Sequence, residues 1–420
     1  MIWEMLYFIQ LDFVELFLDL PMIRLSYTWT DWIPMLPIPV LEGLIWVLLG
    51  AAIMITIGVG YRIAMPVFAL GFTYIFVLDQ AYYNNHLYLL CLLSWWMVFL
   101  PLDASLSWQK GPRRSVPSGV YAILRIHIVI VYFFGGIAKI NPDWLFQYEP
   151  VREILSQAPV IPNLLGNSLS LYLLVYAGLL FDLLAGPLLL LQKTRPIGLA
   201  AAITFNVMNA IIFNDINIFP FFMLGSLLLF LEPQTTQAWF TPKPKKTKGR
   251  SSNKTVSIPK AFYHFLPQPV LRNMLVGYLI FQCIWPLRHL AIPGPVDWTG
   301  QGQLFSWRMK IQNRHIETLS FQVLDYQTKT IIPTDLRAYN VTKDQETALA
   351  MYPAQLHRVA RFLGDRAKDK LGHEEVGVRA TVKVRFNGRR SRDLVNPETD
   401  LYQEEYRPWG QNDWILPLED

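Results

Sequence analysis

The sequence predicts an α-helical polytopic membrane domain of about eight helices, followed by a small extracytoplasmic α+β domain. Hydrophobic residues make up 52% of the 420-residue chain and charged residues only 16%, whereas soluble globular proteins carry about 25% charged residues. Apolar residues gather in runs of about 20, the length that spans a bilayer, before residue 290. Strand-like alternation of apolar and polar residues begins only after that point.

Eight apolar segments can span a membrane if the shorter ones tilt or are buried among their neighbours. Residues 1–20 differ, because acidic residues interrupt them and they lack the basic start of a signal peptide. We expect this segment to form an interfacial helix or a truncated ninth span. The eight predicted helices cover residues 39–60, 63–79, 86–101, 120–139, 169–191, 197–213, 217–232 and 269–286.

Connections rich in lysine and arginine alternate along the chain with connections that have few. Arg62, Arg113, Lys193 and the basic linker 233–268 fall on one side, which the positive-inside rule makes cytoplasmic. The chain then divides into a membrane domain at 1–289 and an extracytoplasmic domain at 290–420, outside the plasma membrane if the source is bacterial. The linker has no interleaved aromatic residues, so we expect no nucleic-acid partner.

The C-terminal domain shows the patterns of a small sheet with a helix. Residues 315–325, 328–333 and 376–386 are predicted strands, and the last alternates apolar residues on one face. Asn387-Gly388 follows it and is typical of a two-residue hairpin turn. Residues 346–370 are predicted to be one helix.

Polar groups inside apolar helices are energetically costly, so each one is a candidate for function. Lys139 ends one predicted helix on the outer side, and His86 begins another there, after Asn84 and Asn85. A lysine at a helix end can instead act as an interface anchor that extends to water.

Two further sets of polar groups lie deeper in the predicted helices. Arg125 and Asp182 are deep charges of consecutive helices, and we expect them to form a structural ion pair. Asn206 and Asn209 lie in the next helix, where interhelical hydrogen bonding is the simpler interpretation. His86 has no metal ligand at suitable spacing, which disfavours a metal site. Nucleophile-elbow, zinc-protease and P-loop motifs are absent from the sequence.

Several stretches resemble the vitamin K-dependent γ-glutamyl carboxylase family, whose bacterial membrane part is called the HTTM domain. The chain starts later than is usual in that family, and Asn206 stands where the family commonly has a histidine. The stretches are DWIPMLP at 31–37, YNNHLYLL at 83–90, LRIHIVIVYFFGGIAKINPDWL at 124–145, LLFDLLAGPLLL at 179–190, FNVMNAIIFNDINIFPFFML at 205–224 and WPLRHLAIPGPVDWTGQGQLFSWRMKI at 285–311.

The resemblance implies a lyase that carboxylates peptidyl glutamate at the γ-carbon. In that family, a base deprotonates vitamin K hydroquinone (reduced phylloquinone or menaquinone), which reacts with O2 to form a strongly basic alkoxide. The alkoxide removes the γ-proton, the carbanion adds CO2, and no metal takes part. A Glu-containing peptide or protein, the lipid quinone and membrane lipid are the expected partners. The alternatives are a quinol-oxidising enzyme of the same fold that does not carboxylate, and a non-enzymatic membrane component.

The resemblance also assigns roles to individual residues. Lys139 aligns with the catalytic base, and burial in an apolar site would disfavour its charged form. His86 aligns with an active-site histidine and is expected to hydrogen-bond the quinol or stabilise developing charge. Asn85 is expected to orient that histidine. The remaining candidates are Asn84, Asn85, Asn206 and Asn209 for the cofactor, and Arg288, His289, Trp298 and Arg308 for the substrate carboxylate, with ordinary packing as the alternative for these last four.

Overall fold

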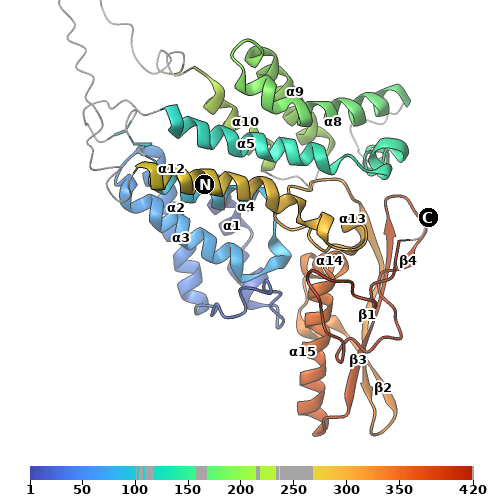
Figure 1. The fold of residues 1–420 in the computed structure, drawn as a ribbon. Helices are drawn as coiled ribbons and strands as arrows, with labels where there is room; N and C mark the ends of the chain where they lie inside the picture. The colour runs from blue at the N-terminus through green and yellow to red at the C-terminus, as the bar shows by residue number, and fades with distance from the viewer. Residues whose placement is uncertain are drawn as a thin grey trace, which may run out of the picture.

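The computed structural model describes residues 1–100, 102–103, 107–108, 118–157, 168–213, 218–232, 236 and 268–418. It consists of a helical N-terminal part and a smaller C-terminal part built on a four-stranded antiparallel sheet (Figure 1). The predicted fold class is therefore confirmed. Most of the basic linker 233–268 lies outside the described residues, so its cytoplasmic placement stays a prediction, as does the domain boundary at 289/290.

Each of the eight predicted membrane helices overlaps a helix of the structure. Five of the described helices are long and apolar enough to cross a membrane, namely Ile38–Ile57, Tyr61–Leu78, Leu169–Leu190, Arg195–Ile212 and Asn273–Ala291. Three others are apolar but shorter. The full bounds are α2 Ile38–Ile57, α3 Tyr61–Leu78, α4 Asn85–Phe99, α5 Ser118–Ala138, α8 Ser168–Leu190, α9 Arg195–Ile212, α10 Phe219–Ser226, which the 3-10 turn η4 Leu227–Phe230 extends, and α12 Gln268–Ile284.

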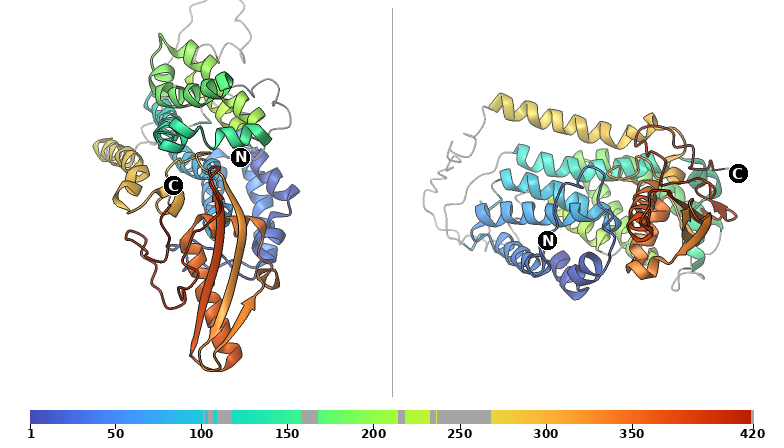
Figure 2. Two further views of the ribbon diagram at one scale, coloured as in Figure 1. Left: turned by 90° about the vertical axis from the view of Figure 1, so that its right-hand side faces the viewer. Right: turned by 90° about the horizontal axis from the view of Figure 1, so that it is seen from below.

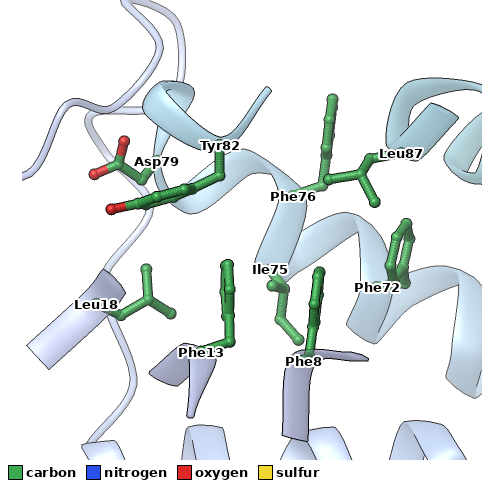
Figure 3. Close-up of a pocket in the computed structure, with 9 residues that line it drawn as sticks. All are labelled: Phe8, Phe13, Leu18, Phe72, Ile75, Phe76, Asp79, Tyr82 and Leu87. Carbon is green, nitrogen blue, oxygen red and sulfur yellow. The ribbon is translucent and has the colours of Figure 1, made fainter. Parts of the chain in front are cut away.

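The N-terminal segment folds against α3 and does not cross the membrane as one helix. It forms α1, Ile2–Gln10, and a short π-helix η1, Glu15–Asp19. Nine residues of α-helix span only about 14 Å, less than half of a bilayer core of about 30 Å. Phe8 stacks on Phe13 with ring centroids 4.3 Å apart, and both face α3 around Phe72 (Figure 3).

The C-terminal sheet has the strand order β2-β1-β3-β4. All its pairings are antiparallel, and α15 packs along one face (Figure 2). Asn387 and Gly388 have φ values of 45° and 70°, and the Arg389 amide donates to the Phe386 carbonyl at 3.0 Å. This is the predicted turn with two positive φ angles. The strands are β1 Arg314–Asp325, β2 Thr330–Thr334, β3 Val376–Phe386 and β4 Arg392–Asp393.

The helix predicted at 346–370 is two helices, which corrects the sequence analysis. α14 spans Lys343–Met351 and α15 spans Pro353–Leu371. Tyr352 between them has extended backbone angles, φ −127° and ψ 96°. A residue that precedes proline is sterically excluded from helical angles, and Pro353 then begins the new helix, where its missing amide hydrogen costs nothing.

Residues 20–31, after η1, form part of the C-terminal domain's core. Ile23 and Leu25 are buried in the same cluster as the inner faces of β3 and α15. Gln345 Nε2 donates to the Ile23 carbonyl at 2.8 Å, and both terminal nitrogens of Arg358 donate to Asp31 at 2.7 and 2.9 Å. The N-terminal segment therefore ties the two parts of the chain together.

Candidate active site

Lys139 and Asp182 form a buried pair where α5 ends against the middle of α8. Lys139 Nζ donates a hydrogen bond to Asp182 Oδ2, and the two residues are only 8% and 3% exposed. Gly136 allows this approach, because a Cβ there would lie 2.9 Å from Leu183 Cγ and 3.0 Å from the Leu183 backbone nitrogen. The lysine is thus not an interface anchor that reaches water.

Two aromatic rings also lie near the ammonium group. Nζ lies 5.2 Å from the ring centroid of Trp144 and 5.9 Å from that of Phe205. Both separations fall within the range of cation–π attraction. Trp144 lies in η3, a short π-helix over Asp143–Gln147, and its Nε1 donates to the Val175 carbonyl at 3.2 Å.

The predicted ion pair between Arg125 and Asp182 is wrong. Arg125 Nε instead donates to the Leu229 carbonyl at 2.6 Å, and its guanidinium lies 5.7 Å from the Phe230 ring centroid. Arg125 precedes Lys139 by 14 residues, which is about 21 Å along a helix. Asp182 faces the Lys139 end of α5, so Arg125 is too far away.

A cavity of about 840 Å³ lies beside the Lys139–Asp182 pair. Its walls come from α4, α5, α8, α9 and α10, and from residues 303–312 and 351–352 of the C-terminal part. Apolar and aromatic side chains form most of the lining. Eight of the residues singled out in the sequence line it, namely Asn84, Asn85, His86, Lys139, Asp182, Asn206, Asn209 and Arg308.

The side-chain amide of Asn206 is hydrogen-bonded within the membrane helices. Its Nδ2 donates to the Tyr132 hydroxyl and to the Ala202 carbonyl, both at 2.8 Å, and the residue is 1% exposed. These two bonds use both amide hydrogens. Only the side-chain oxygen of Asn206 can therefore bind a ligand.

His86 has a neighbour that the sequence analysis missed. Its Nε2 lies 3.6 Å from Oε1 of Glu4, a carboxylate on α1 that is 3% exposed. Asn85, expected to orient His86, instead accepts a hydrogen bond from the Tyr83 hydroxyl at 3.1 Å. A charge within an apolar segment was the one signal in the sequence that marked Glu4.

Of the four candidates for substrate binding, only Arg308 lines the cavity. Its Nε and Nη2 donate to the two carboxylate oxygens of Asp297 at 2.9 and 2.7 Å. His289 lies behind it, with Nε2 3.4 Å from Arg308 Nη1. Arg288 donates to Trp285, Leu304 and Ser306 of its own chain segment.

The prediction that Trp298 binds the substrate is wrong. Trp298 is 1% exposed within the core of the C-terminal domain, and its Nε1 donates to the Leu416 carbonyl at 2.7 Å. An indole ring buried on all sides, with its single donor used, cannot contact a substrate. Its role is to pack the short helix α13, Val296–Thr299, against the sheet.

The hairpin turn of the sheet fixes the C-terminal domain next to the cavity. Both terminal nitrogens of Arg389 donate to Asp143 of η3 at 2.8 and 2.7 Å, and Asn387 Nδ2 donates to it at 2.8 Å. Burial alone would raise the pKa of Asp143, but these bonds outweigh it and hold that pKa below its usual range. Because Trp144 follows Asp143, this contact also supports the aromatic wall beside Lys139.

The two parts of the chain match two protein families. Residues 1–235 match the HTTM domain family. Residues 267–420 match the family described as vitamin K-dependent gamma-carboxylase, lumenal domain. The chain belongs to the vitamin K-dependent γ-carboxylase family. No solved structure matches the chain.

The two family matches divide this carboxylase-family protein in the same way as its structure does. The HTTM match covers the helices that supply most of the cavity, and the lumenal-domain match begins just before α12 and includes residues 303–312 and 351–352. The five long apolar helices make it a membrane protein. Within the described residues, no group of three or more His, Cys, Asp or Glu side chains could hold a metal ion.

Proposed function

We propose that this protein is an integral-membrane peptidyl-glutamate γ-carboxylase that uses vitamin K hydroquinone, O2 and CO2. The observation that carries the proposal is the buried Lys139–Asp182 pair at a cavity shared by the membrane helices and the C-terminal domain. Such a cavity can receive a lipid quinol from the bilayer and a peptide from the aqueous side.

The residues that line the cavity fit a bicyclic quinol. The volume of about 840 Å³ lies within the range of about 300–1,000 Å³ that is usual for small-molecule sites. Apolar walls suit the ring system, and Lys139, His86 and Asn209 supply polar atoms to orient its hydroxyl groups. When bound, the hydroquinone would supply, with O2, a base strong enough to remove the γ-proton of glutamate.

Lys139 and Asp182 would together accept the proton of a quinol hydroxyl. Their pair is neutral overall, whether the shared proton lies on nitrogen or on oxygen. When the shared proton lies on Asp182, the amine of Lys139 is neutral and can accept one additional proton, which gives an ammonium next to a protonated carboxyl. The faces of Trp144 and Phe205 would stabilise that ammonium, which would also offset the negative charge on the group that lost the proton.

Arg308 is the candidate for binding the glutamate carboxylate. Asp297 fixes the plane of its guanidinium by two hydrogen bonds, and the Nη1–H that does not face His289 can donate to a carboxylate. Arg308 enters the cavity from the C-terminal domain, opposite the membrane helices. A substrate held there would meet the quinol between the two parts of the chain.

The proposal is tested with purified protein in detergent micelles, a Glu-containing peptide, vitamin K hydroquinone and labelled bicarbonate. Labelled peptide and quinol epoxide should form together. Formation of epoxide without labelled peptide would favour the quinol-oxidising alternative. If neither product forms, the proposal is refuted.

Substitution of Lys139 tests the assignment of the base. Lys139→Ala should abolish both products, and an added small amine should partly restore epoxide formation, increasingly as the pH rises and more amine is neutral. Lys139→Arg should stay inactive, because arginine does not deprotonate in proteins. Lys193→Ala, at an exposed lysine between α8 and α9, is the matched control. Most of the epoxidase activity surviving in Lys139→Ala would refute the assignment.

A further inference from the structure

Glu4 is a carboxylate in an unfavourable place. It lies in the first turn of α1, among apolar residues, and is only 3% exposed. An isolated carboxylate at such a position is strongly destabilising, so a retained one indicates function or a specific partner. Among the described residues, the ionisable side chain in contact with it is His86, whose Nε2 lies 3.6 Å from Glu4 Oε1. The amino group of Met1 also interacts with the charge of Glu4.

His86 lies between this carboxylate and the cavity. It is 7% exposed at the start of α4 and lines the cavity. In the part of the chain that the structure describes, no side chain or carbonyl forms a hydrogen bond with its ring. Glu4 is therefore the described group that is placed to orient the imidazole and to select its tautomer.

The two ring nitrogens of a neutral histidine have opposite roles, since one donates and the other accepts. A carboxylate accepts hydrogen bonds only. Glu4 next to Nε2 therefore favours the tautomer that carries its proton on Nε2. Nδ1 is then the unprotonated nitrogen, and it is the one left for a group in the cavity.

We propose that Glu4 is a positioning residue that holds His86 in its Nε2–H tautomer, so that Nδ1 accepts a hydrogen bond from a phenolic hydroxyl in the cavity. The identity of that hydroxyl, as one of the quinol, rests on the proposed function. The cavity then has two nitrogen bases, Lys139 and His86, and each is paired with a buried carboxylate. One quinol hydroxyl would be deprotonated at Lys139, and the other would be held at His86.

The tautomer can be measured directly by nitrogen NMR of protein labelled at histidine. His86→Gln identifies the His86 signals among those of the seven histidines. The wild type should show Nε2 protonated and Nδ1 bare, and Glu4→Gln should shift His86 to a mixture of tautomers. Glu15→Gln, the same change at an exposed position nearby, should leave the spectrum unchanged. A protonated Nδ1 in the wild type, or an unchanged His86 signal in Glu4→Gln, would overturn the proposal.

Kinetics separate positioning from folding. Glu4→Gln should lower kcat for epoxide formation by about 10- to 100-fold, as the loss of a carboxylate that orients a histidine does at metal sites, while its melting temperature stays near that of Glu15→Gln. Glu4→Asp should restore part of the rate. A full rate in Glu4→Gln would count against the role. If the wild type forms no epoxide at all, the proposed function fails, and the NMR result still decides the relation of Glu4 to His86.

Discussion

Removing one member of the Lys139–Asp182 pair should destabilise the protein more than removing both. The side chains are 10% and 5% exposed, so each single substitution leaves a buried group without its partner. Breaking a buried pair in this way costs about 3–5 kcal/mol. We expect the cost of Lys139→Ala to lie at the upper end of this range, because the substitution also removes the contacts of the ammonium with Trp144 and Phe205.

The double variant Lys139→Ala/Asp182→Ala leaves no uncompensated charge. We expect it to cost no more than one single substitution. If each single costs about 3–5 kcal/mol, the coupling between the two sites is then at least about 3 kcal/mol. A coupling of this size is expected only for residues in direct contact.

Reversible unfolding in mixed micelles, followed by tryptophan fluorescence, measures the four free energies of the cycle. Leu180→Ala, at a residue of α8 that is 55% exposed, controls for shortening an apolar side chain on the same helix. Additive effects of the two alanine substitutions would refute the pairing. They would also remove the basis for treating the two residues as one proton acceptor.

Three further predictions concern packing, the domain contact and the substrate. Gly136→Ala should cost about 1–3 kcal/mol through overpacking against Leu183, whereas Gly43→Ala, with nothing within 4 Å of its new Cβ, should not lower the melting temperature. The Asp143 contact should weaken as the pH falls through the lowered pKa of Asp143 and be fully present above the ordinary aspartate pKa; limited proteolysis of the domain junction should therefore accelerate in acid for the wild type but not for Asp143→Asn. Arg308→Gln should raise the peptide KM in the carboxylation assay, whereas Trp298→Ala should cost about 3–5 kcal/mol of folding free energy and leave the KM of the folded fraction unchanged.

Hydropathy and alternation were sufficient to predict the eight apolar helices and three of the four strands. The long apolar runs became α2, α3, α8, α9 and α12, and the Asn387-Gly388 turn formed where the sequence placed it. These features depend on residues that are adjacent or periodic in sequence. The signal for the helix break at Tyr352–Pro353 also lies in adjacent residues. The apolar pattern continues from one helix into the next, however, and so concealed the break.

The partners of charged side chains could not be predicted in the same way. Arg125 and Asp182 are both deep in their helices, and nothing in the sequence states which turn of α5 faces Asp182. The answer depends on where the glycines let α5 and α8 approach, at Gly136 and next to Lys139. Glu4 was missed for a related reason, because only the packing of α1 brings it to His86.

Residues 20–31 have a consequence for how the chain is made. Ile23 finds its partner, Gln345, only 322 residues later, which at about 5–20 residues per second corresponds to roughly 15–65 s of synthesis. During that time Ile23 and Leu25 have no core to enter. Residues 20–31 and the C-terminal domain share one core, so both have to reach the same side of the membrane although apolar helices separate them in the sequence. Assembly of the C-terminal domain therefore has to follow synthesis of the apolar helices, and a ribosome that stops before residue 345 would release a chain in which the hydrogen bond between Gln345 and Ile23 cannot form.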